Sequence, residues 1–146
     1  MDTLKQIGNR LLRVAVSAVT VLLVGYSGSA LSDEVKVALG GNQEIPPVTT
    51  LASGTGTITV RADKSISGSV TIFGMSVTVA HIHEAAAGAN GPIVVPLIKT
   101  SDNVWAVPAG VKFTDAQYES YKAGNLYFNI HSDAHKGGEI RGQIKP

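Results

Sequence analysis

No cysteine occurs among the 146 residues of the chain, which excludes disulfide bonds, thiolate metal sites and lipid attachment through an N-terminal cysteine. The sequence also lacks a G-x-S-x-G nucleophile elbow, an H-E-x-x-H zinc motif, a phosphate-binding loop and a dinucleotide-binding glycine pattern. Neither sign of charge dominates, since 12 basic and 11 acidic residues give a net charge of +1. Without a basic stripe, nucleic-acid binding has no electrostatic support. These absences favour a binding protein over an enzyme.

Residues 1–32 have the layout of a secretory signal peptide. Three basic residues come first: Lys5, Arg10 and Arg13. An uncharged run of hydrophobic and small residues follows at 14–24, and then the small and polar stretch GYSGSALS. Small residues before a cleavage point are typical of such leaders, so we expect cleavage before Asp33.

An uncleaved membrane anchor is the alternative for the same segment. Residues 14–31 carry no charge and are about as long as the shortest membrane-spanning helix, roughly 17–18 residues. In both cases we expect residues 33–146 to form a domain outside the cytoplasm. The domain is periplasmic or secreted if the leader is cleaved, and tethered to the membrane if residues 14–31 are retained as an anchor. Without the three basic residues and one acidic residue of the leader, the domain has nine basic and ten acidic residues, a net charge of −1. The overall composition is typical of one compact domain.

The domain consists of short runs rich in Val, Ile and Thr, separated by turn-forming residues. Many short strands at this spacing predict an all-β fold, either a β-sandwich or a Greek-key barrel. We expect strands at 34–40, 55–62, 65–73, 76–83, 93–99, 103–107, 125–131 and 139–144.

One short helix is expected among the strands. Thr114 and Gln117 have the spacing of a capping box, with Thr114 at the N-cap and Gln117 at the third helical position. Gly124 supplies a C-terminal stop. The helix therefore has two turns at most and should close one end of the sandwich.

Two of the four histidines, His81 and His83, form an H-x-H pair in one predicted strand. Residues two apart in a strand project from the same face, roughly 6.6 Å apart, and two imidazoles there can share a metal ion. A hydrogen-bonded structural pair and acid–base catalysis are the other interpretations. The face is open as well: the histidines point into the core if Val79 does, and outward if Ile82 is the core residue.

The C-terminal strands place more polar residues on a common face. In 125–131 the apolar residues alternate with polar ones, and the same holds for 139–144. A third histidine, His131, and a fourth, His135 in the intervening Gly-rich loop, lie in this region. The polar face is predicted to hold Tyr127, Asn129, His131, Glu139, Arg141 and Gln143.

Three motifs together resemble the CHRD domain, a repeat first described in chordin and widespread in bacterial secreted proteins. They are H-I-H followed by G-x-x-G-P in AHIHEAAAGANGPIVVPL (80–97), then Y-F-N-I-H, and then G-G-E-I-R-G-Q, the last two within 124–144. The resemblance spans nearly all of 35–146. It implies a Greek-key β-sandwich like that of immunoglobulins or copper/zinc superoxide dismutases. The H-x-H strand also resembles the copper-ligand strand of those dismutases, but the cysteine pair and the zinc-site spacing are missing, which argues against dismutase activity.

These observations lead to one hypothesis about function. The domain is expected to bind a metal ion for copper handling or as a subunit of a copper-dependent assembly. Copper is favoured because histidine sites bind it tightly in the Irving–Williams order, and zinc is the alternative. The expected ligands are His81, His83, His131 and, least securely tied to the others, His135. Residues expected to support them by hydrogen bonding are Glu139, Asn129 and Arg141.

A different interpretation removes the metal. Glu139 and Arg141 can simply pair with each other, and the histidines can be structural. The domain is then an interaction module that docks another exported or membrane protein through a sheet edge or the AAAGANG loop.

Overall fold

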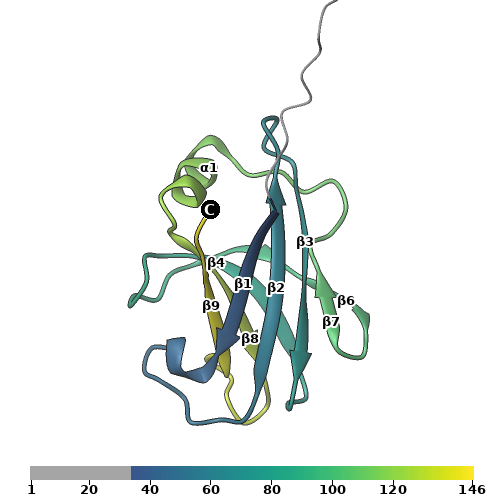
Figure 1. Ribbon diagram of the computed structural model, residues 1–146, viewed down its shortest axis with the longest axis vertical. Coiled ribbons are helices and arrows are strands. Elements are labelled where there is room, and N and C mark those ends of the chain that lie inside the picture. Colours follow the sequence, from purple (N-terminus) through teal and green to yellow (C-terminus); the bar gives the residue numbers. More distant parts are fainter. Residues whose placement is uncertain (1–33) are drawn as a thin grey trace, which may run out of the picture.

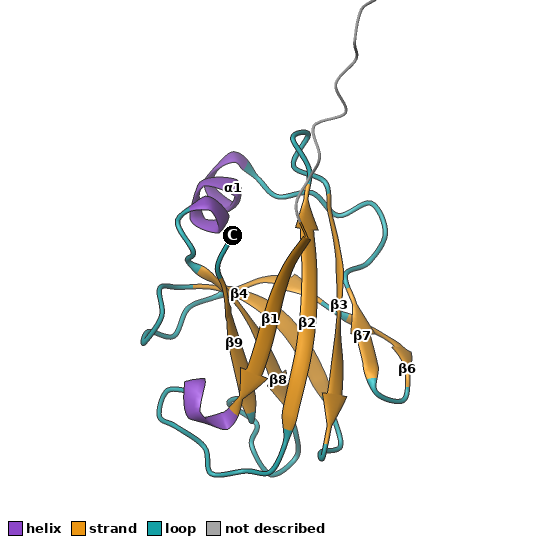
Figure 2. Ribbon diagram, viewed as in Figure 1, coloured by secondary structure: helices purple, strands orange, loops and turns teal. Residues whose placement is uncertain are grey.

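The computed structural model describes residues 34–146, so the predicted leader or anchor at 1–32 lies outside the described residues. The described chain is an all-β domain with one short α-helix, as expected from the sequence (Figure 2). No helix within residues 34–146 is long and apolar enough to cross a membrane. The elements are β1 (Glu34–Gly40), the 3₁₀ turn η1 (Gly41–Gln43), β2 (Ser53–Val60), β3 (Ile66–Phe73), β4 (Val79–Glu84), β5 (Ile93–Pro96), β6 (Ile98–Ser101), β7 (Val104–Ala106), α1 (Asp115–Lys122), β8 (Leu126–His131) and β9 (Ile140–Ile144).

The nine strands form one antiparallel sheet in the order β5-β4-β8-β9-β1-β2-β3-β7-β6. The sheet curls, so that β4 and β8 pass behind β1, β2 and β3 (Figure 1). Its two edge strands, β5 and β6, are consecutive in the chain and are separated by Leu97 alone. The two edges are therefore held close together, and the sheet nearly closes around its core.

The prediction of a single strand at 93–99 was wrong in one respect. The chain pairs with β4 as far as Pro96 and then with β7 from Ile98. Between the two pairings, the buried Leu97 donates its backbone N–H to the carbonyl of Ala80 at 2.9 Å. The apolar run continues from β5 through Leu97 to Ile98, so it conceals this change of partner.

The core lies between the two halves of the curled sheet. Gly54 and Gly56 of β2 face this core, and a Cβ at either position would lie 3.3 Å from Ile140 Cδ1 or 3.1 Å from Phe128 Cε2, respectively. The missing side chains thus leave room for large residues from β8 and β9. Fully buried residues from both halves meet there: Ile58, Val70, Ile82, Leu126, Phe128, Ile130, Ile140 and Ile144.

Helix α1 begins and ends where the sequence predicts. Thr114 Oγ1 accepts a hydrogen bond from the backbone N–H of Gln117, whose side chain accepts one from the N–H of Thr114, so both halves of the capping box are present. At the other end Gly124 has φ of 72°, and Asn125 donates its N–H to the carbonyl of Ser120 at 2.8 Å. This left-handed closing turn stops the helix after two turns.

Strand β8 is buried along its whole length. Its apolar residues face the core, whereas Tyr127, Asn129 and His131 face the other side and are still at most 7% exposed. Loop segments before β2, after β4 and after β8 cover this second face: Asn129 contacts Glu44, Tyr127 contacts Gly91, and His131 contacts Lys136. The polar face predicted from the C-terminal strands therefore exists, but it is covered by loops.

Candidate metal centre

Strand register settles which way the H-x-H pair points. Strand β4 pairs with β8 so that His81 lies opposite Asn129 and His83 opposite Tyr127. Ile82, between the two histidines, is 0% exposed and belongs to the core. Because side chains alternate along a strand, His81 and His83 must lie on the opposite face, the one that carries His131. The question left open by the sequence is resolved in favour of the outward orientation.

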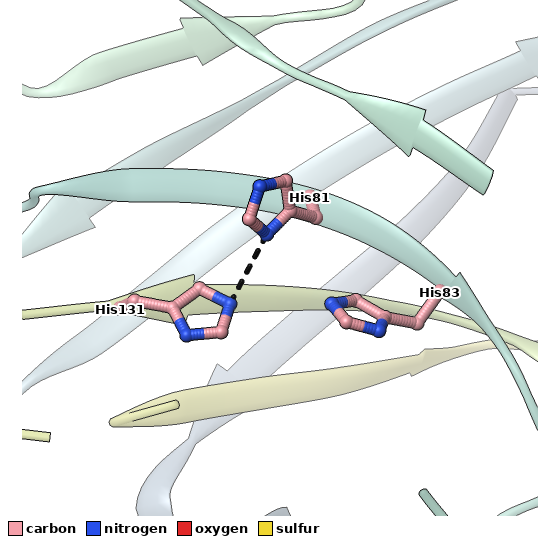
Figure 3. Close-up of side chains that lie close together, drawn as sticks. All are labelled: His81, His83 and His131. Carbon is pink, nitrogen blue, oxygen red and sulfur yellow. Dashed lines mark hydrogen bonds between the residues drawn. The ribbon is translucent and has the colours of Figure 1, made fainter. Parts of the chain in front are cut away.

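The three imidazoles converge on one point (Figure 3). The Nδ1 atom of His81 lies 3.2 Å from the Nε2 atom of His131, and one ring nitrogen from each of His81, His83 and His131 lies within 4.8 Å of the other two. A metal ion with Zn–N-type bonds of about 2.0–2.1 Å separates its tetrahedral ligand atoms by about 3.3 Å. The three nitrogens are thus spaced so that a small closing movement of the side chains would let them share one metal ion.

Backbone carbonyls fix the orientation of two of the rings. The Nδ1 atom of His83 lies 2.9 Å from the carbonyl oxygen of Gly91, and the Nδ1 atom of His131 lies 2.9 Å from that of Lys136. A carbonyl can only accept, so in the neutral ring Nδ1 carries the proton and Nε2 keeps its lone pair. Metal-binding histidines are commonly held in this way through their second nitrogen.

The Nε2 atom of His83 is the least satisfied atom of the group. It is buried and has no hydrogen-bond partner; among the buried side-chain nitrogens and oxygens of residues 34–146 it shares this property only with Trp105 Nε1. A buried polar atom without a partner costs about 1–3 kcal/mol. A lone pair held in this state next to two other imidazoles is what a metal ligand requires.

Burial also favours the uncharged forms of His81 and His83. It is the largest cause that lowers the pKa of His81 to about 4, and the neighbouring His131 and His83 lower it further. The pKa of His83 is also lowered, mainly by burial, although its hydrogen bond to Gly91 opposes the change. At neutral pH both rings are therefore uncharged, and each has one nitrogen with a lone pair. Because His131 Nδ1 donates to Lys136, its Nε2 accepts the hydrogen bond from His81 Nδ1, so a metal ion bound at that His81 nitrogen would have to displace its proton.

The fourth histidine lies apart from this group. His135 is half-buried, and its backbone N–H donates to Ser132 Oγ at 3.2 Å while its carbonyl accepts from Gly138 at 3.1 Å. Its ring is not among the three that converge. His135 is close to His131 in the sequence. In the structure, however, the backbone of His135 forms hydrogen bonds with Ser132 and Gly138 in the loop after β8.

Two of the expected supporting residues make their hydrogen bonds elsewhere. Asn129 Nδ2 donates to Glu44 Oε1 at 2.5 Å. Glu139 accepts from Thr50 Oγ1 at 2.7 Å and from Ser132 Oγ at 2.5 Å. These side chains tie the loops to β8 and β9, and the direct partners of the imidazoles are the backbone carbonyls described above. The two carbonyls lie in glycine-containing loops, and this is the only sign of them in the sequence. The spacing of residue types does not identify a main-chain carbonyl.

Arg141, the third expected supporting residue, forms a stack with the ligand group. Its guanidinium carbon lies 3.4 Å from the ring centroid of Tyr127, and the other neighbour of Tyr127 is His83, at 5.0 Å between centroids with 15° between the planes. Arg141 also donates to the carbonyls of Ala89 at 2.8 Å and Ala86 at 3.3 Å. Arg141 thus holds the loop that contains Gly91, the hydrogen-bond partner of His83. Within residues 34–146 the partners of Arg141 do not include Glu139.

Comparison with known proteins gives one assignment. No curated protein and no solved structure matches the chain significantly. The sequence profile of the CHRD domain matches residues 35–144, which includes all nine strands apart from the first residue of β1. This is an extracellular type of domain. The chain therefore belongs to the CHRD domain family.

Proposed function

We propose that the protein is an exported CHRD module that binds one copper ion through His81, His83 and His131, for copper handling or as a subunit of a copper-dependent assembly. The observation that carries this proposal is the convergence of three imidazole nitrogens within 4.8 Å, one of them buried and without a partner. Two ligands are already oriented by carbonyls, so little side-chain entropy remains to be lost on binding.

Copper is preferred to zinc on the chemistry of the ligand set. The three ligands are neutral imidazoles, with no carboxylate or thiolate in the group. Imidazole suits both metals, but Cu²⁺ stands above Zn²⁺ in the Irving–Williams order. Zinc would also need a fourth ligand to complete its tetrahedron, and His135 lies outside the group. Zinc remains the alternative metal.

Export is supported by two independent features. The CHRD domain is of the extracellular type, and residues 1–32 have the order of charge, hydrophobicity and small residues found in a signal peptide. We infer a periplasmic or secreted protein, or one anchored to the membrane by residues 14–31. Mass analysis of the N-terminus of the exported protein distinguishes cleavage before Asp33 from retention.

The test of the metal site is a titration with Cu²⁺, Cu⁺ and Zn²⁺ against competing chelators. His83→Ala removes a ligand, and we expect it to lower copper affinity by at least about 100-fold, the upper range seen when only a supporting residue is lost. His135→Ala is the matched control, since it removes an imidazole outside the group, and it should bind as the wild type does. Equal affinity of the wild type and His83→Ala contradicts the assignment.

A metal-free interaction module is the second candidate, and one observation favours it. His81 and His131 already share a hydrogen bond at 3.2 Å, so the imidazoles partly satisfy one another without an ion. In this case the domain docks another exported or membrane protein, and chelation leaves that binding unchanged. His81→Ala then lowers the melting temperature equally with and without copper, whereas a metal site makes the loss larger when copper is present.

A further inference from the structure

Arg141 is a buried cation without a carboxylate partner at ion-pair distance. It is 1% exposed, and none of the ion pairs formed within residues 34–146 includes it. Its guanidinium is satisfied instead by the carbonyls of Ala86 and Ala89 and by the side-chain oxygens of Asn90 and Gln143. Burying a charge in this way is costly.

Arg141 lies close enough to His83 for its positive charge to act on an ion bound there. Tyr127 lies on the central strand of three, with His83 on one side and Arg141 on the other. The guanidinium carbon is 3.4 Å from the Tyr127 centroid, and that centroid is 5.0 Å from the centroid of His83. The separation of guanidinium and imidazole is therefore at most the sum of these, 8.4 Å.

We propose that Arg141 is a positioning and charge-tuning residue of the metal centre, which holds His83 through Tyr127 and the 85–92 loop and favours copper(I) over copper(II). This inference rests on the proposed function. It goes beyond it because it assigns the oxidation state that the site prefers and names the residue that sets the preference.

The positioning part follows from two connected contacts. Arg141 holds the carbonyls of Ala86 and Ala89, and the same loop is held at Gly91, whose N–H donates to Tyr127 Oη at 3.1 Å. Gly91 then accepts from His83 Nδ1 at 2.9 Å. The orientation of His83 thus depends on the loop, and the loop depends on the fork of donors that only arginine provides.

The charge part follows from Coulomb's law. A copper ion bound to His83 lies roughly 10 Å from the guanidinium, given a bond of about 2 Å beyond the imidazole ring. At an effective dielectric constant of about 20, a unit charge at that distance changes the relative affinity for Cu²⁺ and Cu⁺ by about tenfold. The three ligands are neutral imidazoles, so no anion within the ligand set offsets this preference.

The test is the reduction potential of the copper-loaded protein, with Cu⁺ and Cu²⁺ affinities measured separately by chelator competition. Arg141→Gln removes the charge and should lower the potential by about 59 mV, which corresponds to a tenfold change for one electron. Arg141→Lys keeps the charge but loses the planar fork, so its potential should stay near that of the wild type while both affinities fall. Glu44→Gln, which removes the carboxylate bound to Asn129 on the same face, should raise the potential.

Each outcome is decisive. An unchanged potential in Arg141→Gln, or an equal shift in Arg141→Lys, overturns the charge argument, and unchanged affinities in Arg141→Lys overturn the positioning argument. If Arg141→Gln does not fold, as judged by circular dichroism, the sign of the shift in Glu44→Gln decides. Failure of the wild type to bind copper at all overturns the proposed function itself, which is a separate result from any of these.

Discussion

The carbonyl of Gly91 is the contact on which the proposed metal centre depends most directly, and Gly91→Ala tests it. A Cβ added at this position would lie 1.8 Å from the carbonyl oxygen of Glu84 and 2.7 Å from its carbonyl carbon. Both atoms belong to the backbone of β4, at the end of the strand that carries the H-x-H pair. Because β4 is paired on both sides, the backbone at Gly91 must move instead.

That movement breaks two hydrogen bonds at once. Gly91 accepts from His83 Nδ1 at 2.9 Å and donates to Tyr127 Oη at 3.1 Å. Loss of a partner that orients a metal-binding histidine costs about 10–100-fold in metal affinity, which corresponds to about 1.4–2.7 kcal/mol. The overpacking itself should lower the free energy of unfolding of the metal-free protein by about 1–3 kcal/mol.

Two measurements check this prediction. Chelator competition gives the copper affinity, and the nitrogen chemical shifts of the His83 ring report which nitrogen carries the proton. Gly88→Ala is the control in the same loop: Gly88 has nothing within 4 Å of an added Cβ, although its φ of 84° makes alanine strained there. We expect Gly88→Ala to lose some stability but to keep its metal affinity. Wild-type affinity and an unchanged His83 tautomer in Gly91→Ala would refute the role of this carbonyl.

Three further predictions follow from burial and hydrogen bonding. Ile82→Ala should lower the free energy of unfolding by about 2–5 kcal/mol because Ile82 is fully buried; a loss below 1 kcal/mol in urea unfolding contradicts the orientation of the H-x-H strand. Glu139→Gln should lower the melting temperature, since Glu139 holds Thr50 and Ser132, yet leave copper affinity within about threefold; a larger loss of affinity makes Glu139 part of the site. The pKa of His81 is about 4 in the folded state against an ordinary 6.5, so between these values the unfolded chain binds more protons and stability is lost as the pH falls. Urea unfolding with chelator at pH 7 and pH 5 should show this loss, and His81→Gln should reduce it.

Much of the fold follows from local sequence signals. The capping box at Thr114 and the glycine at 124 fix both ends of α1, and alternation of apolar residues identifies most strands. The exception is the run at 93–99, where the chain changes partner at Leu97. Alternation and β-propensity describe how a segment fits a sheet but not which strand it joins, so the near-closure of the sheet was not predictable from this segment.

The candidate site shows the same division. The H-x-H spacing and the polar face of β8 are sequence features, and pairing of β4 with β8 brings them together. The orientation of the histidines, however, depends on register, because a shift of one residue turns every side chain to the other face. The atoms that orient the rings are main-chain carbonyls of Gly91 and Lys136, and no side-chain pattern reports a carbonyl.

The loops over β8 explain why these small segments matter more than their composition suggests. A polar strand face buried under loops needs partners for each of its side chains, and here the backbone of 85–92 and 132–139 supplies several of them. At Gly91 the close approach of the loop requires glycine, since a Cβ there would lie 1.8 Å from the carbonyl oxygen of Glu84. The Ala- and Gly-rich run after the H-x-H pair is thus best understood as the covering layer of the site. It follows that substitutions which displace the carbonyl of Gly91 should alter metal affinity, although no side chain of this loop belongs to the histidine group.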